Sequence, residues 1–291
     1  MKKINIFCFG FGQVAKNFIK KINTEKFSIN LSVTTREQSK VKQFNEIKYN
    51  NFIFNDKIFD NGLIENLKNS DHILISIPPI NGKDIVIKYF GEVIKECNPK
   101  WITYLSATSV YGDHKGEWVN EESETNPKST SGIGRLEAEK SWITFTANSK
   151  LPFQIFRLSG IYSNQKNILA RLKSGNVNLI NKKNQFFSRI HVEDIANVLF
   201  KSLSNFKTGE IYNISDDKPA SMEEVTLYGV KLLNVDIPKI IEVKDIGSEM
   251  LKSFYKDSKK VSNKKMKSFF DYKLKFPTYV EGLNYIRNNF V

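Results

Sequence analysis

The feature that most constrains the fold of this chain is a strand, a glycine turn and a helix near its start. The apolar stretch at residues 4–9 is typical of a buried strand, and Gly10 and Gly12 follow it directly. Apolar side chains then recur at helical spacing over residues 13–22, with lysines on the opposite face. Gly10 would allow a tight turn, Gly12 would let the backbone approach a pyrophosphate, and Ala15 would let helix and strand pack closely.

This turn predicts a dinucleotide-binding site, because the N–H groups and positive end of a helix N-terminus attract phosphate groups. The alternative is an ordinary strand-to-helix turn with incidental glycines. The placement of the glycines between a strand and an amphipathic helix favours the cofactor site. We expect the turn and the first helical residues to contact the cofactor: Gly10, Phe11, Gly12, Gln13 and Val14.

The end of the second predicted strand indicates which dinucleotide is bound. NAD sites usually carry an acidic residue there, which accepts hydrogen bonds from the ribose hydroxyls. This chain has Thr34, Thr35 and Arg36 instead, and a guanidinium with two hydroxyls fits a 2′-phosphate better than a bare diol. The sequence therefore predicts NADP, with NAD as the alternative cofactor. A surface Arg36 without any role in the site is the competing interpretation.

Strand and helix patterns alternate along most of the chain, which predicts an α/β fold with a parallel sheet covered on both faces. The expected strands are at residues 4–9, 29–34, 52–54, 73–77, 101–105, 153–158 and 210–214. A helical pattern spans residues 85–94, and Ser221 with Glu224 matches a capping box that begins another helix. Residues at the end of the fourth strand are expected to contact the cofactor: Ser76, Ile77 and Pro78. Pro78 should end the strand and shape the adenine side of the groove.

Composition narrows the classes of function. The formal net charge is +13, but the lysines are spread along the chain. Their densest group, at residues 256–267, lacks the interleaved aromatic side chains of a nucleic-acid stacking platform, so we expect a solvated surface and no nucleic-acid partner. No apolar run approaches the roughly 18 to 20 residues of a membrane helix, and we expect a soluble, cytoplasmic protein. The cysteines and histidines lack metal-ligand spacing, so no metal site is predicted.

Five short segments in the second part of the chain share their order and spacing with one superfamily. The segments are residues 106–112, residues 132–139, residues 157–162, residues 189–196 and residues 211–214. Together they resemble the extended short-chain dehydrogenase/reductases, the group of sugar-nucleotide epimerases and dehydratases.

This resemblance implies a Rossmann-like doubly wound parallel sheet with a smaller C-terminal substrate lobe. It implies an NAD(P)-binding part that consists of residues 1–160 together with the later segment 189–215. The substrate lobe would then consist of residues 161–188 and 216–291. Ser106 and Ala107 are then expected near the cofactor. The resemblance also implies a small-molecule substrate and allows a homodimer.

The catalytic positions of this superfamily are changed in the chain. Members that transfer hydride use a Ser or Thr after the fifth strand and a Tyr-x-x-x-Lys pair, but the matching residues here are Ala107, Ser131 and Arg135. An aliphatic hydroxyl is a far weaker acid than a phenol, and a guanidinium stays protonated, so neither can inherit the proton transfer. The Asp-Glu pair of dehydratases is replaced by Thr108 and Ser109. The chain therefore resembles an atypical member, in which Arg135 could still hold the cofactor ribose.

If catalysis survives, other side chains must move the proton. Tyr111 is the first choice, because it lies shortly after the fifth strand, where open parallel sheets bind ligands. Ser109, Ser131 and Arg135 would assist it. A packed Tyr111 with a satisfied hydroxyl is the alternative. In the substrate lobe the candidates are Tyr162 and His191.

Two functions follow from these observations. The first is an NAD(P)-dependent oxidoreductase or epimerase that acts on a hydroxylated or nucleotide-linked small molecule, and we expect an enzyme of this kind. The second is an NADP-binding sensor or scaffold protein without turnover, in which the changed triad records lost chemistry. For His191 itself, the alternative is a structural histidine bonded near the start of the following helix. A third, an RNA- or DNA-associated protein that uses its basic surface, is the weakest.

Overall fold

The computed structural model describes residues 3–37, 43–80, 82–180 and 182–290 of the chain. The chain divides into two compact units. The first unit contains Met1–Ala107, Thr130–Arg157 and Ile195–Tyr212, and the second contains Thr108–Ser129, Leu158–Asp194 and Asn213–Val291. The predicted boundaries differ from this division mainly at residues 108–129, which were expected in the dinucleotide-binding part. Residues 158–160, 189–194 and 213–215 were also expected there and lie in the second unit.

Long-range pairing explains why residues 108–129 belong to the second unit. Strand β7 (Trp118–Val119) pairs in parallel with β14 (Lys260–Val261). The Asp113 carboxylate accepts a hydrogen bond from the Ser258 backbone N–H at 2.8 Å. Sequence patterns do not reveal such a pairing, because each strand has only two residues.

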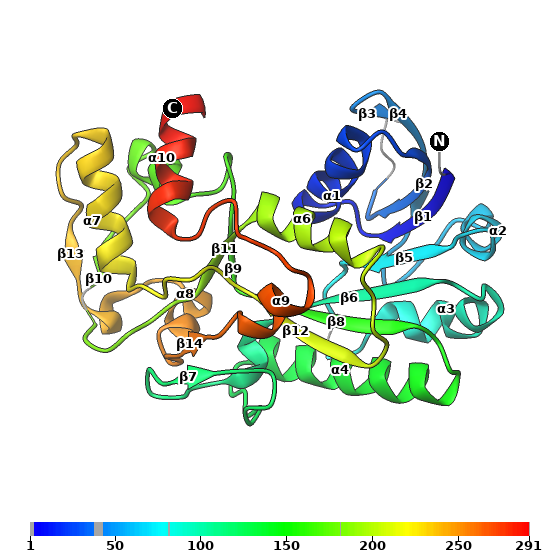
Figure 1. Ribbon diagram of the computed structural model, residues 1–291. Helices are drawn as coiled ribbons and strands as arrows, with labels where there is room; N and C mark the ends of the chain where they lie inside the picture. The colour runs from blue at the N-terminus through cyan, green and yellow to red at the C-terminus, as the bar shows by residue number, and fades with distance from the viewer. Residues whose placement is uncertain (1–2, 38–42, 81, 181, 291) are drawn as a thin grey trace. The chain divides into compact units, whose positions relative to one another are not determined.

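The main sheet has eight strands in the spatial order β12-β8-β6-β5-β1-β2-β4-β3 (Figure 1). The strands are β1 (Lys3–Phe9), β2 (Ser28–Thr35), β3 (Gln43–Phe44), β4 (Ile47–Ile53), β5 (His72–Ile75), β6 (Trp101–Ala107), β8 (Phe153–Leu158) and β12 (Glu210–Ile214). Strand β1 pairs in parallel with β2 on one side and β5 on the other. The strand order therefore reverses at β1, and ligands of open α/β sheets bind beyond the carboxyl ends of the strands at such a point.

All seven predicted strands are present, but several bounds differ: β5 ends at Ile75 rather than at residue 77, β6 extends to Ala107, and β4 differs most. The strand expected at residues 52–54 is β4, which begins at Ile47, while Phe54 forms only an isolated bridge to Phe59. Its outer neighbour is the two-residue strand β3. Near this edge Lys48 and Asn50 are exposed, so the first half of the strand lacks a continuous apolar run.

Helices cover both faces of the sheet (Figure 1). Helices α2 (Gly62–Lys68), α3 (Ile85–Glu96) and α4 (Thr130–Asn148) contribute to one apolar core cluster, in which Phe9, Phe90 and Trp142 are fully buried. On the other face lie α1 (Gln13–Thr24) and α6 (Val192–Ser202). The ring of Phe18 stacks 6.0 Å from Trp101, whose indole N–H donates to the Ser202 hydroxyl at 3.1 Å. The predicted α/β architecture is thus confirmed.

The described residues of the second unit form short parallel strand pairs and five helices. Besides β7 and β14, β9 (Gly160–Tyr162) pairs with β11 (Arg189–His191), and β10 (Leu179–Ile180) pairs with β13 (Ile240–Ile241). The helices are α5 (Ile168–Lys173), α7 (Met222–Leu233), α8 (Glu249–Phe254), α9 (Lys264–Phe269) and α10 (Tyr279–Phe290). Short 3₁₀ turns lie at Thr108–Tyr111 and Val243–Asp245. Helices α5, α7 and α10 share a core that includes Leu169, Val225 and Leu283.

The capping box predicted at the start of α7 is half formed. The Ser221 hydroxyl accepts a hydrogen bond from the Glu224 backbone N–H at 2.9 Å. The second bond of the box, from the Ser221 backbone N–H to the Glu224 carboxylate, is not formed. The carboxylate instead pairs with Lys218 at 2.9 Å and accepts a hydrogen bond from the Tyr279 hydroxyl at 2.7 Å.

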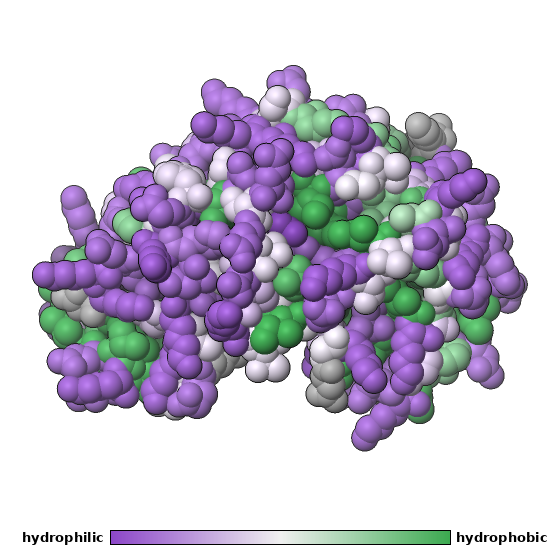
Figure 2. Space-filling view, turned by 90° about the horizontal axis from the view of Figure 1, so that it is seen from below, coloured by the Kyte–Doolittle hydropathy of each residue, from purple (hydrophilic) through white to green (hydrophobic). Residues whose placement is uncertain are grey.

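The surface is predominantly hydrophilic on the face shown in Figure 2, with smaller apolar areas between the polar side chains. Several lysines of the cluster at residues 256–267 have individual partners within the protein. Lys259 donates to the Gly112 carbonyl at 2.7 Å, and Lys267 pairs with Asp217 at 2.9 Å. Within the described part of the chain, none of the helices has both the length and the hydropathy needed to cross a membrane.

Candidate functional site

The turn after β1 is held by two neighbouring strands. Gly10 has a φ of +90°, a conformation that favours glycine. Its N–H donates to the Thr34 hydroxyl at 2.8 Å, near the end of β2. The Ser76 hydroxyl, which follows β5, lies 3.0 Å from the Phe9 carbonyl and 3.1 Å from the Gly10 carbonyl. A Cβ at Gly10 would lie only 2.7 Å from the Ser76 Oγ, so the turn requires glycine here.

Gly12 is the N-cap of α1 and provides no side chain to cap the helix. A Cβ at Gly12 would have no neighbour within 4 Å among the described residues. The first N–H groups of a helix have no intrahelical partner, and behind them Ala15 is fully buried. An uncapped and uncrowded helix start of this kind fits a pyrophosphate. The residues present therefore fit a bound dinucleotide.

The other residues predicted to contact the cofactor at this turn are Phe11, Gln13 and Val14, and they offer it mainly their backbone atoms. The Phe11 ring packs at 5.6 Å from Phe44 and 5.2 Å from Tyr49, measured between ring centroids. Val14 is buried and Gln13 is half-buried in the first turn of α1. Phe11 thus anchors the turn through its side chain, while its backbone continues toward the helix.

The structure separates the roles of the three residues at the end of β2. Thr34 is fully buried, and its hydroxyl accepts the hydrogen bond from the Gly10 N–H. The Thr35 hydroxyl lies 2.6 Å from the Glu37 carbonyl and 3.0 Å from the Asn51 Oδ1. The Arg36 side chain is exposed, and its guanidinium has no ion pair with the residues that the structure describes. Of the three, Arg36 is the side chain with a charge available for a ligand.

The residues after β5 lie beside the glycine turn. The Ser76 backbone N–H donates to the Phe9 carbonyl at 2.9 Å. The Ile77 side chain would lie 3.2 Å from a Cβ placed at Gly10. Pro78 is exposed. These contacts bring Ser76 and Ile77 together with the turn, so the segment can form one wall of a nucleotide site.

The positions matched to the superfamily's catalytic residues lie at the end of β6 and the start of α4. Ala107 is half-buried and offers no hydroxyl, and Ser131 is exposed in the first turn of α4. Ser106 is buried, and its hydroxyl has no hydrogen-bond partner among the described residues. Arg135 donates from Nη1 to the Leu105 carbonyl at 2.6 Å. This bond ties the guanidinium to the end of β6.

Tyr111, the first-choice proton donor, is fully buried in the second unit. Its hydroxyl donates to the Asn213 Oδ1 at 2.8 Å. Ser109 is half-buried in the same 3₁₀ turn, and its carbonyl accepts from the Gly112 N–H at 3.2 Å. This geometry favours the packed-tyrosine alternative over an acid/base role for Tyr111.

Tyr162 and His191 lie together in the interior of the second unit, with ring centroids 5.0 Å apart. Burial raises the pKa of the Tyr162 phenol. Burial also lowers the pKa of His191 to about 4. The His191 Nδ1 accepts from the Glu193 N–H at 3.3 Å, and its ring contacts Phe276 at 4.2 Å. Histidine is therefore neutral here at pH 7, and the contacts favour its structural role.

Sequence reasoning missed a buried ion pair between α4 and β8. Glu139 and Arg157 have exposed side-chain fractions of only 1% and 5%. The Arg157 Nη2 donates to Glu139 Oε2 at 2.7 Å, and Nε lies 3.1 Å from Oε1. An arginine in the mostly apolar strand β8 was the available signal, because a buried charge needs a partner.

The model of the NAD dependent epimerase/dehydratase family matches residues 89–215. Among solved structures, a functionally unknown conserved protein from Silicibacter pomeroyi DSS is 30% identical, with a TM-score of 0.88 and 98% of each chain covered. No curated protein matches the sequence.

More distant structures share the fold. UDP-glucuronic acid 4-epimerase from Bacillus cereus, solved with NAD, is 14% identical with a TM-score of 0.76, and covers 98% of this chain and 99% of its own. The dTDP-glucose 4,6-dehydratase from Bacillus anthracis str. Ames, also solved with NAD, is 18% identical with a TM-score of 0.77, and the coverage is 98% and 96%. With its glycine turn, sheet order and family match, the chain belongs to the NAD-dependent epimerase/dehydratase family of extended short-chain dehydrogenase/reductases.

Proposed function

We propose that this protein is an NADP-dependent oxidoreductase or epimerase that acts on a hydroxylated or nucleotide-linked small molecule. The observation that carries the proposal is the glycine turn, in which Gly10 is locked by Thr34 and Ser76 while Gly12 leaves the helix start open. The distant structures named for nucleotide-sugar epimerases and dehydratases support the same class of reaction.

The residues of the first unit divide the work of holding the cofactor. The N–H groups at the start of α1 would bind the pyrophosphate, and Arg36 would bind the 2′-phosphate. Ser76 and Ile77 would line the adenine side. The nicotinamide, when bound, supplies a hydride acceptor or donor. Arg135 holds the Leu105 carbonyl and so positions the end of β6 beside the site.

The choice of NADP over NAD depends on Arg36, and affinity measurements test it. We expect Arg36→Ala to lower NADPH affinity about 10-fold or more, because a charge-assisted hydrogen bond contributes roughly 1.5–3 kcal/mol. NADH affinity should not change. Lys20→Ala removes an exposed charge from α1 and serves as the matched control. NADPH affinity that is equal in wild type and Arg36→Ala would remove Arg36 from the site.

A second function, an NADP-binding sensor or scaffold protein, is favoured by one observation. The phenol and imidazole candidates Tyr111, Tyr162 and His191 are all buried. Such groups serve packing unless the substrate reaches them. Assays of NADPH oxidation with a panel of aldehydes, ketones and sugar nucleotides separate the two functions. Turnover supports the enzyme, whereas tight NADPH binding without turnover of any panel member supports the sensor.

A further inference from the structure

The surface of the second unit carries an exposed tryptophan beside a lysine, on the pair of strands β7 and β14 (Figure 1). In this parallel pair Trp118 is the register partner of Lys260, and Val119 is the partner of Val261. Successive side chains of a strand point to opposite faces. Both valines are 1% exposed, whereas Trp118 is 55% exposed. Trp118 and Lys260 therefore project together from the outward face of the pair.

The Lys260 side chain is held in place by a second aromatic residue. Its Nζ lies over the ring of Phe186, 4.4 Å from the ring centroid. This cation–π contact is attractive and restricts an otherwise flexible side chain. Because the ammonium group covers this face of Phe186, the aromatic surface that stays open to a ligand is that of Trp118.

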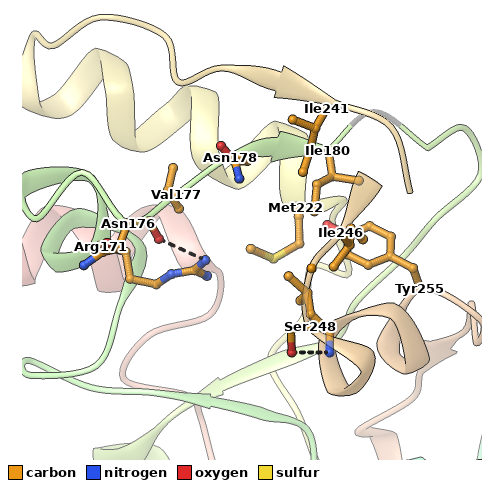
Figure 3. Close-up of a pocket in the computed structure, with 12 residues that line it drawn as sticks. Arg171, Asn176, Val177, Asn178, Ile180, Met222, Ile241, Ile246, Ser248 and Tyr255 are labelled. Carbon is orange, nitrogen blue, oxygen red and sulfur yellow. Dashed lines mark hydrogen bonds between the residues drawn. The ribbon is translucent and has the colours of Figure 1, made fainter. Parts of the chain in front are cut away.

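This surface is separate from the pocket drawn in Figure 3. That pocket lies between the end of α5, strand β10, the start of α7 and the segment before α8. Tyr255 lines it, and the Tyr255 ring contacts Phe187 with centroids 5.4 Å apart. Trp118, Phe186 and Lys260 do not line it. An occupant of the pocket would therefore leave the tryptophan surface open.

Two more lysines lie in loops that meet beside β14. The Gly116 N–H donates to the Ser258 carbonyl at 2.9 Å, and the Ser258 hydroxyl donates to the Asn184 carbonyl at 2.7 Å. Lys115 and Lys183 are the chain neighbours of these contacts, and both are exposed. Neither forms an ion pair within the described part of the chain. Their charges remain available to an anionic partner.

The acidic side chains of these loops compete little with such a partner. Asp113 accepts two backbone N–H bonds, the shorter from Ser258 at 2.8 Å. The Asp257 carboxylate lies 3.7 Å from the Lys259 Nζ, and both side chains are largely buried. Glu117 is exposed, but the alternation along the strand directs it away from the face of the tryptophan. An aromatic plane and unpaired positive charges are thus combined on one surface.

We propose that this surface binds single-stranded nucleic acid, with a base stacked on Trp118 and neighbouring phosphates on Lys260, Lys115 and Lys183. Stacking on an aromatic side chain suits any base, and lysines neutralise the phosphates. The lysine-rich segment at residues 256–267 was expected to have no nucleic-acid partner, because no aromatic residue lies among its lysines. The fold supplies that aromatic side chain from more than a hundred positions earlier in the chain.

Tryptophan fluorescence of the full chain without cofactor tests the proposal. Trp101 and Trp142 are buried, so quenching by an added strand reports on Trp118. We expect a thymidine decanucleotide to quench this fluorescence saturably at about 50 mM salt. An abasic strand of the same length and charge should bind about 5-fold or more weakly, because it keeps the phosphates but has no base to stack.

A pair of variants isolates the stacking contribution, measured by the fluorescence anisotropy of labelled strands. Trp118→Ala should bind the thymidine and abasic strands equally. Phe290→Ala removes another exposed aromatic side chain of the second unit, 54% exposed, and should keep the preference for thymidine. Equal binding of the two strands by the unaltered protein, or a preference that persists in Trp118→Ala, would overturn the stacking assignment.

The salt dependence isolates the lysines. Three phosphate contacts on a single strand predict a loss of about 20-fold in affinity between about 50 and 200 mM salt. This dependence should nearly vanish in a variant that combines Lys115→Gln, Lys183→Gln and Lys260→Gln. The control removes the same charge from exposed positions elsewhere in the second unit, through Lys231→Gln, Lys239→Gln and Lys273→Gln. Equal salt dependence in the two triple variants would refute the role of the three lysines.

The result is independent of the proposed NADP-dependent function. The residues of this surface belong to the second unit, whereas the glycine turn belongs to the first. A thymidine strand that fails to bind at about 50 mM salt would overturn the nucleic-acid surface and leave the cofactor proposal standing. NADPH that fails to bind would do the reverse.

Discussion

Replacing Gly10 with alanine should destabilise the first unit, and the structure allows the magnitude to be worked out. At a φ of +90°, an L side chain costs roughly 1–2 kcal/mol. The new Cβ would also lie 2.7 Å from the Ser76 Oγ and 3.2 Å from Ile77 Cγ1. Displacing the Ser76 hydroxyl loses its hydrogen bond, about 1 kcal/mol. Together these effects predict a loss of roughly 2–4 kcal/mol in the free energy of unfolding.

Gly12→Ala is the matched control, because it adds the same methyl group where no described neighbour lies within 4 Å. Its φ of −83° suits any residue, and an alanine N-cap should cost about 1 kcal/mol or less relative to glycine. This variant should instead weaken NADPH binding at least about tenfold, because the methyl group would occupy the approach of the pyrophosphate.

Urea unfolding followed by tryptophan fluorescence is the assay for stability. Trp101 and Trp142 are fully buried in the first unit, whereas Trp118 of the second unit is 55% exposed. The fluorescence change therefore reports mainly on the first unit. Adding Ser76→Ala to Gly10→Ala should restore about 1 kcal/mol, since the closest contact is removed. Equal stability of the two glycine variants would refute the steric argument, and unchanged NADPH affinity in Gly12→Ala would refute the pyrophosphate site.

Three further predictions concern buried polar groups. Glu139→Gln leaves the Arg157 charge buried without its carboxylate, and should lower the free energy of unfolding by about 3–5 kcal/mol. Adding Arg157→Met should recover much of that loss in urea titrations, and a single-variant loss below about 1 kcal/mol would contradict the reasoning. The pKa of His191 falls from 6.5 to about 4 on folding, so the unfolded chain binds more protons between these values and stability should decline by roughly 3 kcal/mol as the pH falls from 6.5 to 4. His191→Asn should flatten this dependence in unfolding curves measured across that range, and an unaltered slope would argue against it. Tyr111→Phe leaves the Asn213 Oδ1 without its donor and should cost about 1–3 kcal/mol while any NADPH turnover persists. Loss of turnover at full stability would instead make Tyr111 catalytic.

Local patterns predicted most of the fold correctly. Apolar runs located the seven long strands, because strands buried in a parallel sheet need continuous apolar sequence. Helical periodicity placed the amphipathic faces of α1 and α3, whose buried residues include Phe18 and Phe90. Two-residue strands such as β7 and β14 carry no comparable signal, and their pairing depends on residues more than a hundred positions apart.

What the sequence determined by itself was the element order and the glycine turn, since strand, turn and helix depend on side chains near one another in the chain. Only the tertiary structure decided which partners the individual polar groups bind. The Thr34 hydroxyl accepts a hydrogen bond from the Gly10 N–H, the Tyr111 hydroxyl donates to Asn213, and Glu139 pairs with Arg157. A polar side chain bonds to whatever the fold brings within about 3 Å of it. Those neighbours are distant in sequence, so the sequence alone does not reveal them. The residue type determines which bonds a side chain can form, and the packing determines whether that side chain remains available to a ligand.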